Sequence, residues 1–370
     1  MVTNLFVILL ILIIGFHYSR KNDCNNYLNR KKYIWVICFI LILQSGLRNV
    51  AVGADTYAYF NSFENSKNQS WDDVWEIVSE YYKYDIGKDP GFPVFEKFCS
   101  TISDSYQIFL VIIAILFFVS LGNFILKNTT KLQDVILAFV IYSVLFYGFF
   151  SITGHRQTLA TALTLLSFEF IKKRKIIPFL IVILIASTLH KSSLIFILFY
   201  FVCRIKKPKI IFISTLLLFP LFMSTRDLLA AFFQSISGYE GYDQFEGAGT
   251  FTFSAIFLLI CITALIRQKI LLKSNSNTQN YFNAFALALL FLPLTWINPS
   301  MMRVVQYFSI FMLIFVPEII RSFEFYSEDI HQRVRIVTLF VLILLFLKSS
   351  QNGEPYSFFW EEVKLGKHYE

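Results

Sequence analysis

The sequence is poor in charge for a chain of its length. Only 16% of its 370 residues are charged, whereas 56% are hydrophobic and the mean hydropathy is +0.59. A water-soluble protein of this size could not bury so much apolar surface. The shortage of charge therefore excludes a soluble globular protein and indicates a polytopic membrane protein.

The apolar runs also lack the alternation of polar and apolar residues that a transmembrane barrel requires. Residues 7–14 and 336–347 are almost continuously apolar. An α-helix satisfies its backbone hydrogen bonds within one segment, so such runs cross a bilayer as helices. We therefore predict an all-α integral membrane protein.

Motifs for metal and disulfide chemistry are absent. No cysteines have CxxC spacing or lie at metal-ligand spacing from a histidine, and no carboxylate cluster has an obvious two-metal arrangement. The five cysteines are Cys24, Cys38, Cys99, Cys203 and Cys261. We predict neither a disulfide framework nor a zinc site, and no metal or other cofactor.

Twelve apolar stretches approach the length of about 20 residues that a membrane-spanning helix needs. They comprise residues 2–18, 33–47, 107–126, 132–150, 156–171, 176–190, 191–204, 209–224, 251–267, 281–297, 303–320 and 334–348. The first lacks the basic region and cleavage site of a signal peptide, so we interpret it as a span. Without an internal repeat or a low-complexity linker, the chain 1–370 is predicted to form one polytopic membrane domain.

Basic residues sort the connecting segments into two alternating sets. One set holds 21 of the 33 Lys and Arg residues and comprises 19–32, 127–131, 172–175, 204–209, 267–280 and 321–335. Because cytoplasmic loops carry the excess of Lys and Arg, this set is predicted to be cytoplasmic and both termini periplasmic. A net charge of +8 that is spread in this way signals topology and indicates no nucleic-acid partner.

The predicted periplasmic set includes the long segments 48–106 and 225–250. Segment 48–106 has 10 Asp and Glu residues against 5 Lys and Arg residues. Apolar residues recur at helical spacing from Trp71 to Val78, which predicts an amphipathic helix on the membrane or against the bundle. Segment 48–106 is therefore predicted to be an external helical cap between spans 2 and 3, and segment 225–250 a periplasmic loop.

Arg156 stands where a membrane protein normally avoids a cation. It lies with Gln157 in the predicted periplasmic turn 151–157, at the start of a span. Short external loops disfavour Lys and Arg, and a cation at a helix N-terminus opposes the helix dipole. Lys191 and Arg303 also fall in first turns of helices that run inward. The three N-termini could converge on one anion, such as a phosphate.

The hairpin 176–203 is too short for two full spans, so its tip should stop below the outer surface. The tip places His190 and Lys191 at a depth that is costly unless a polar cavity reaches them. His190 could instead be a neutral histidine bonded to a backbone carbonyl. Arg48 could snorkel from the end of its span, and Arg303 could pair with an acidic residue of the cap.

Two carboxylates and one tyrosine complete the predicted external cluster. Asp55 and Asp89 could instead be turn or N-cap residues. For Asp89 this structural role is slightly favoured, because Pro90 follows it. Tyr242, in segment 225–250, could belong only to an interfacial aromatic belt.

Four short motifs, in order and with consistent topology, give the sequence a family resemblance. They are Arg48…Gly53-x-Asp55-Thr56-x-x-Tyr59, Pro90-Gly91-Phe92, His155-Arg156-Gln157 and Leu189-His190-Lys191-Ser192. Over residues 30–205 the chain resembles the EpsG family of bacterial membrane proteins of exopolysaccharide and capsule synthesis, which are grouped with Wzy-type O-antigen polymerases. The family usually has Ile-Arg-Gln where this chain has His155-Arg156-Gln157, a departure that leaves the Arg-Gln pair intact.

The resemblance implies a glycosyltransferase with a GT-C-like helical fold in the bacterial inner membrane. It would join undecaprenyl-diphosphate-linked oligosaccharide units, as donor and acceptor, at the periplasmic face, for O-antigen, capsule or exopolysaccharide. The protein would lie in the lipid bilayer, and its protein partners would be a flippase and a chain-length regulator. A membrane acyltransferase that modifies a surface glycan and a flippase of the same lipid-linked oligosaccharide are the alternatives.

The predicted chemistry assigns roles to the polar residues. A lipid diphosphate leaving group requires preorganised cations, for which we select Arg156 with Arg303 or Arg48. The acceptor hydroxyl requires a base, and His190 and Asp55 are the two candidates. The remaining predicted substrate-binding residues are Gln157, Lys191, Asp89 and Tyr242.

Overall fold

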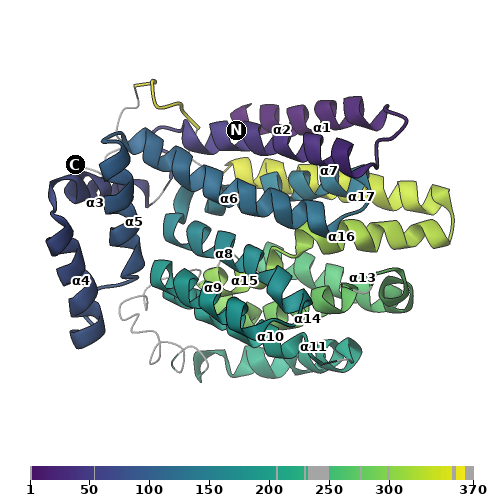
Figure 1. Cartoon of the computed structure of the whole chain (residues 1–370). Coiled ribbons are helices and arrows are strands. Elements are labelled where there is room, and N and C mark those ends of the chain that lie inside the picture. Colours follow the sequence, from purple (N-terminus) through teal and green to yellow (C-terminus); the bar gives the residue numbers. More distant parts are fainter. Residues whose placement is uncertain are drawn as a thin grey trace. The chain divides into compact units, whose positions relative to one another are not determined.

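The computed structural model describes residues 2–53, 55–205, 207–228, 231, 250–275, 277–297, 301–351 and 356–362. Within these residues the fold is helical, and the only extended pairing is an isolated antiparallel bridge between Arg48 and Phe358. The prediction of an all-α protein is confirmed for the described chain (Figure 1).

The N-terminal half contains α1 to α9. In chain order these are α1 (Val2–Ser19), α2 (Tyr27–Gly46), α3 (Thr56–Asn68), α4 (Trp71–Tyr84), α5 (Gly91–Ile102), α6 (Tyr106–Asn128), α7 (Leu132–Ile141), the π-helices η1 (Tyr142–Phe146) and η2 (Gly148–Thr153), α8 (His155–Lys172) and α9 (Ile176–Leu189).

The described part of the C-terminal half contains further helices, several of them short. They are the 3-10 helix η3 (Lys191–Phe196), α10 (Ile197–Val202), α11 (Pro208–Ser224), α13 (Phe251–Ser274), α14 (Thr278–Phe291), the 3-10 helix η4 (Leu292–Trp296), α15 (Met302–Ser309), α16 (Met312–Arg321), the 3-10 helix η6 (Ser322–Phe325) and α17 (Glu328–Gln351).

Four described helices are long and apolar enough to cross a membrane: α1, α6, α13 and α17. A fifth span results if Met302–Ser309 and Met312–Phe325, which are bent by 47° at their junction, count as one. All twelve predicted segments contain helix, but several are too short to pass this test. Helix α9, with 14 residues, is only about 21 Å long, against a hydrocarbon thickness of about 30 Å.

The chain divides into two compact units. Unit 1 comprises 1–166, 184–190 and 336–370, and unit 2 comprises 167–183 and 191–335. In unit 1, α2 packs along α6, and α1 packs against α7 and α2 (Figure 1).

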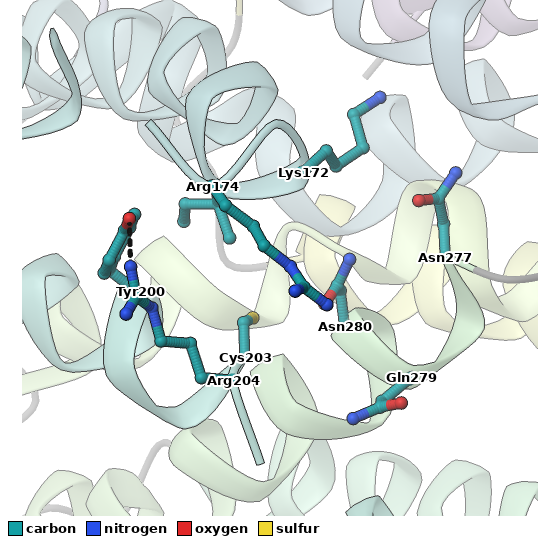
Figure 2. Close-up of a pocket in the computed structure, with 9 residues that line it drawn as sticks. Lys172, Arg174, Tyr200, Cys203, Arg204, Asn277, Gln279 and Asn280 are labelled. Atoms are coloured by element: carbon teal, nitrogen blue, oxygen red, sulfur yellow. Dashed lines mark hydrogen bonds between the residues drawn. The ribbon is translucent and has the colours of Figure 1, made fainter. Parts of the chain in front are cut away.

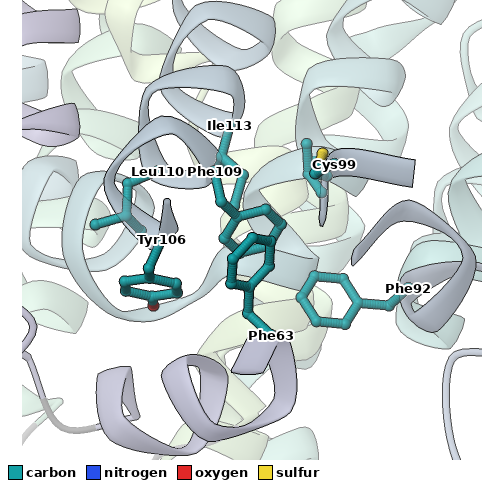
Figure 3. Packing of buried hydrophobic residues seen from close by; sticks show 8 residues of the cluster. Phe63, Phe92, Cys99, Tyr106, Phe109, Leu110 and Ile113 are labelled. Atoms are coloured by element: carbon teal, nitrogen blue, oxygen red, sulfur yellow. The ribbon is translucent and has the colours of Figure 1, made fainter. Parts of the chain in front are cut away.

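Segment 48–106 folds into α3, α4 and α5, which form a helical subdomain of unit 1. A capping box between Ser70 and Asp73 begins α4, and on this helix Val74 is buried whereas Trp75 is exposed. Helices α3 and α5 pack on each other and on the start of α6 through a buried aromatic cluster. Figure 3 shows its centre, where Phe63 stacks on Phe109 with ring centroids 4.8 Å apart.

The C-terminal segment 356–362 fixes the end of α2. The backbone N–H of Asn49 donates to Ser357 O at 2.9 Å, and the N–H of Phe359 donates to Leu47 O at 3.0 Å. The hydroxyl of Tyr356 donates to Gln44 O at 2.6 Å. These bonds surround Arg48, so the far end of the chain helps to hold this arginine in place.

Unit 2 has an aromatic core between its helices. Helix α14 packs along α11 and α15. The ring of Phe168 stacks on Phe199 and meets Phe311 edge-on, with centroids 5.9 and 4.9 Å apart. One polar contact at this core joins Glu318 to Thr278, whose hydroxyl donates a hydrogen bond of 2.5 Å to the carboxylate.

Candidate functional site

Asp89 links the arginine and the histidine that the sequence singled out. Its Oδ2 lies 3.4 Å from Nη1 of Arg156 and 3.3 Å from Nδ1 of His190. The Asp89 and His190 side chains are buried, whereas 30% of the Arg156 side chain is exposed. Unit 1 therefore joins a buried carboxylate, a buried imidazole and a guanidinium that solvent can reach.

Local backbone geometry brings Asp89 to this position. Asp89 has a φ of 50°, a left-handed conformation that Asp and Asn tolerate better than most residues, and its carbonyl accepts the N–H of Phe92 at 2.9 Å. Gly91 begins α5 directly against α9, where an added Cβ would lie 2.8 Å from Cβ of Thr188. Since only glycine fits there, Gly91 permits the approach that places Asp89 beside His190.

Arg156 is held mainly by aromatic faces. Its guanidinium carbon lies 4.8 Å from the ring centre of Phe92 and 5.8 Å from that of Tyr59. Its Nε is buried without a hydrogen-bond partner among the described residues. A cation on aromatic faces is attracted without losing its hydrogen-bond donors, so Arg156 keeps donors for an anionic ligand.

His190 has one ring nitrogen engaged and the other unused. It follows the last residue of α9, and its backbone N–H donates to Ala186 O at 2.9 Å. Because a carboxylate only accepts hydrogen bonds, contact with Asp89 places the ring proton on Nδ1. Nε2 is buried and has no hydrogen-bond partner among the described residues.

Arg48 and His155 form a second polar pair next to Arg156. Nη2 of Arg48 lies 2.6 Å from Nε2 of His155, and the same guanidinium donates to the carbonyls of Ser45 and Ile152. Arginine has no acceptor, so His155 must be neutral with Nε2 unprotonated. The ring of Tyr59 stacks on His155 with centroids 4.3 Å apart. Arg48 is buried, and its Nη1 and Nη2 contact groups of the protein, whereas its Nε has no hydrogen-bond partner among the described residues.

Two π-helical turns precede Arg156, a feature that hydrophobic periodicity does not reveal. Helix α7 continues as η1 and η2 up to Thr153, and α8 begins at His155. π-helical turns are rare and occur frequently at functional sites. In the last turn of η2, which ends at Thr153, the carbonyl of Ile152 accepts from Arg48 and that of Phe150 accepts from the hydroxyl of Thr158.

Glu96 is a buried carboxylate that the sequence did not single out. It lies one turn after Phe92 on α5, and its Oε2 accepts a hydrogen bond of 2.8 Å from the hydroxyl of Ser62. Burial raises the pKa of Glu96 to about 7, although Ser62 and Arg156 oppose the shift. Phe92 and Tyr59 were also missed as partners of Arg156, but both belong to the quoted motifs.

The other predicted residues lie around or apart from this cluster. Asp55 is the N-cap residue of α3, where its carbonyl accepts the N–H of Tyr59 at 3.2 Å. Gln157 is buried beside Arg156. Tyr242 lies outside the described residues.

Lys191 and Arg303 belong to unit 2. Lys191 begins η3, which packs against α15, and Arg303 is the second residue of α15. The hydroxyls of Ser192 and Tyr307 approach to 3.4 Å between these two helices. The convergence of both cations with Arg156 on one anion stays a prediction.

A comparison with protein-family models matches residues 31–360 to the EpsG family. This match covers most of the chain. The chain belongs to the EpsG family. EpsG proteins are Wzy-type polysaccharide polymerase-like membrane proteins, so this is a polymerase-like membrane protein of polysaccharide biosynthesis. Neither the curated proteins nor the solved structures contain a match to the chain. The EpsG match extends well beyond residues 30–205, on which the resemblance of the motifs rests.

Proposed function

We propose that this EpsG protein is a glycosyltransferase that polymerises oligosaccharide repeat units linked to undecaprenyl diphosphate. The observation that carries the proposal is the contact of Asp89 with both Arg156 and His190. This arrangement offers a cation for a diphosphate and a base for a sugar hydroxyl within one cluster. Membership of the EpsG family supports the substrate class.

Arg156 would bind the diphosphate of the donor. As the bond between the anomeric carbon and the diphosphate oxygen breaks, negative charge grows on that oxygen, and a positioned guanidinium stabilises it. Asp89 occupies one edge of Arg156 at 3.4 Å, a distance too long for a strong charge-assisted bond. The remaining donors, and the exposed part of the side chain, serve the lipid diphosphate.

His190 would act as the base. The acceptor hydroxyl attacks the anomeric carbon, its proton passes to Nε2 of His190, and the lipid diphosphate leaves. Asp89 accepts the Nδ1 proton and so keeps Nε2 free, and it stabilises the imidazolium that forms. Asp55 is the alternative base, and the contact between Asp89 and His190 favours His190.

We also propose a GT-C-like membrane architecture with twelve spans in the bacterial inner membrane. Both termini and the subdomain 48–106 would lie on the periplasmic side, where lipid-linked repeat units are joined. The positive charge of alternate connecting segments supports this topology. A flippase and a chain-length regulator would be functional partners.

Two substitutions test the polymerase proposal in cells that lack the native gene. Arg156→Ala and His190→Gln should each abolish polymer and leave the single-repeat product on the cell surface. Arg333→Ala and His17→Gln are matched controls, because Arg333 is exposed in a surface ion pair with Asp329 and His17 lies in α1. Both controls should give normal chain length.

The pattern of products separates the alternatives. Loss of both polymer and single-repeat product in the two site variants would indicate a flippase. Normal chain length with a missing acyl group would indicate an acyltransferase. Normal polymer in the His190→Gln variant would reject His190 as the base and leave Asp55.

A further inference from the structure

Unit 2 contains a cavity of about 240 Å³ whose polar lining is rich in cations and amides (Figure 2). None of its lining residues is acidic. The lining residues that carry a cation or an amide are Lys172, Arg174, Arg204, Asn277, Gln279 and Asn280. This composition matches the donors that bind phosphate groups in proteins.

Arg174 occupies a backbone position that normally takes glycine. Helix α8 ends in a Schellman motif, in which the N–H of Lys175 donates to Phe170 O and the N–H of Arg174 donates to Ile171 O. Arg174 therefore adopts the left-handed conformation, with a φ of 56°. A residue with a Cβ is disfavoured there relative to glycine, so the backbone gives no reason for an arginine.

The side chain of Arg174 extends into the cavity (Figure 2). No hydrogen bond or ion pair joins its guanidinium to any described residue. The other two cations are engaged. Lys172 pairs with Glu169 at 2.5 Å, and Arg204 donates to the hydroxyl of Tyr200 at 2.5 Å with its guanidinium over the tyrosine ring. Arg174 is thus the cation with all its donors available to a ligand.

Helix α14 adds amide donors from the opposite wall. Asn277 is its N-cap residue, and its side chain makes no capping bond. Asn280 lies in the first turn, and the amide of Gln279 donates to the carbonyl of Ile205, which connects this wall to the end of α10. The positive end of the α14 dipole faces the same cavity and favours an anion there.

We propose that this cavity binds a phosphate group, either the head group of an acidic phospholipid or a soluble phosphate ester. The lining cations come from segments 172–175 and 204–209, and the amides from 267–280, which the charge pattern assigns to the cytoplasm. Basic pockets of membrane proteins on that side bind anionic lipid head groups. The site is independent of the proposed polymerase chemistry, because none of its residues takes part in that reaction.

Binding to the full-length protein in a neutral detergent tests the proposal. The probes are inorganic phosphate and dioctanoyl-phosphatidylglycerol, with dioctanoyl-phosphatidylcholine as the zwitterionic control. Arg174→Gly removes the guanidinium and suits the left-handed backbone, and Arg174→Asn is a second variant that tolerates this conformation. Lys173→Ala removes the same charge from an exposed neighbour that does not line the cavity.

We expect saturable binding of at least one anionic probe to the native protein. The dissociation constant should rise about tenfold or more in both Arg174 variants, because a charge-assisted hydrogen bond is lost, and stay unchanged in Lys173→Ala. Binding of phosphate alone identifies a soluble ligand, and binding of only the phosphatidylglycerol identifies a lipid head group. The proposal is overturned if neither probe binds, if both Arg174 variants bind as the native protein does, or if Lys173→Ala weakens binding equally.

Discussion

The substitution Asp89→Asn separates charge from geometry at the candidate site. Asparagine has nearly the same shape as aspartate and tolerates the left-handed backbone, with its φ of 50°, that this position requires. Its carbonyl oxygen can still accept the Nδ1 proton of His190. The variant therefore keeps the arrangement and removes only the negative charge between His190 and Arg156.

The structure sets the size and the sign of the expected effects. At 3.3 Å and an effective dielectric constant of about 20, the attraction between Asp89 and a protonated His190 is about 5 kcal/mol before desolvation. Desolvation offsets part of this attraction. If the variant loses about 3 kcal/mol of transition-state stabilisation, kcat falls about 100-fold. Arg156, freed from its carboxylate neighbour at 3.4 Å, should bind the anionic donor at least as tightly, so KM should stay equal or fall.

Purified enzyme and a defined lipid-linked repeat unit give both constants. The formation of polymer is followed over a range of donor concentrations, and the thermal midpoint of each variant is recorded in parallel. Asp104→Asn is the matched control, because Asp104 lies in the loop before α6 and is exposed. A normal kcat in Asp89→Asn would refute the reasoning. So would a lower kcat that comes with a higher KM and a lower thermal midpoint, because that combination indicates a structural role.

Two further predictions concern pH and topology. Because burial raises the pKa of Glu96 from 4.5 to about 7, the folded protein holds this proton where the unfolded chain releases it. The stabilisation is present below about pH 4.5 and is lost as the pH rises through about 7, so the thermal midpoint should fall between about pH 5 and pH 8. Glu96→Gln should flatten this fall, whereas Glu76→Gln, on an exposed position of α4, should not; an unchanged profile in Glu96→Gln would contradict the assignment. For topology, cysteines placed at Lys175 and Lys207 should react only after the membrane is permeabilised, whereas one at Asn68 should react in intact spheroplasts. Labelling of Asn68 and Lys207 from the same side would reject twelve spans with periplasmic termini.

The sequence by itself determined the class of protein and the positions of its helices. Composition identified a membrane protein, and uninterrupted apolar runs identified helical segments, because both properties depend on residues close together in the chain. The spacing of the apolar residues between Trp71 and Val78 was sufficient to predict helix α4. Arg156 stood out because short external loops and helix N-termini disfavour a cation, and His190 because the tip of a short hairpin places it at a costly depth.

The lengths of the helices and the breaks within them could not be predicted well from the sequence. Apolar composition is the same in an α-helix and in a π-helix, so η1 and η2 before Arg156 could not be predicted. The bend between Ser309 and Met312 divides one apolar stretch into α15 and α16. It could not be predicted either, because the stretch is apolar on both sides of the bend. These interruptions account for part of the difference between the twelve apolar segments and the four or five helices that are both long and apolar enough to cross a membrane.

Only the tertiary structure decided which polar residues meet. Asp89 lies 67 positions from Arg156 and 101 from His190, and Arg48 lies 107 positions from His155. Local periodicity carries no information over such separations. The contacts depend on how closely α5 approaches α9 at Gly91 and on how the C-terminal segment fixes the end of α2. The sequence supplied the charged residues, and packing determined which of them became partners.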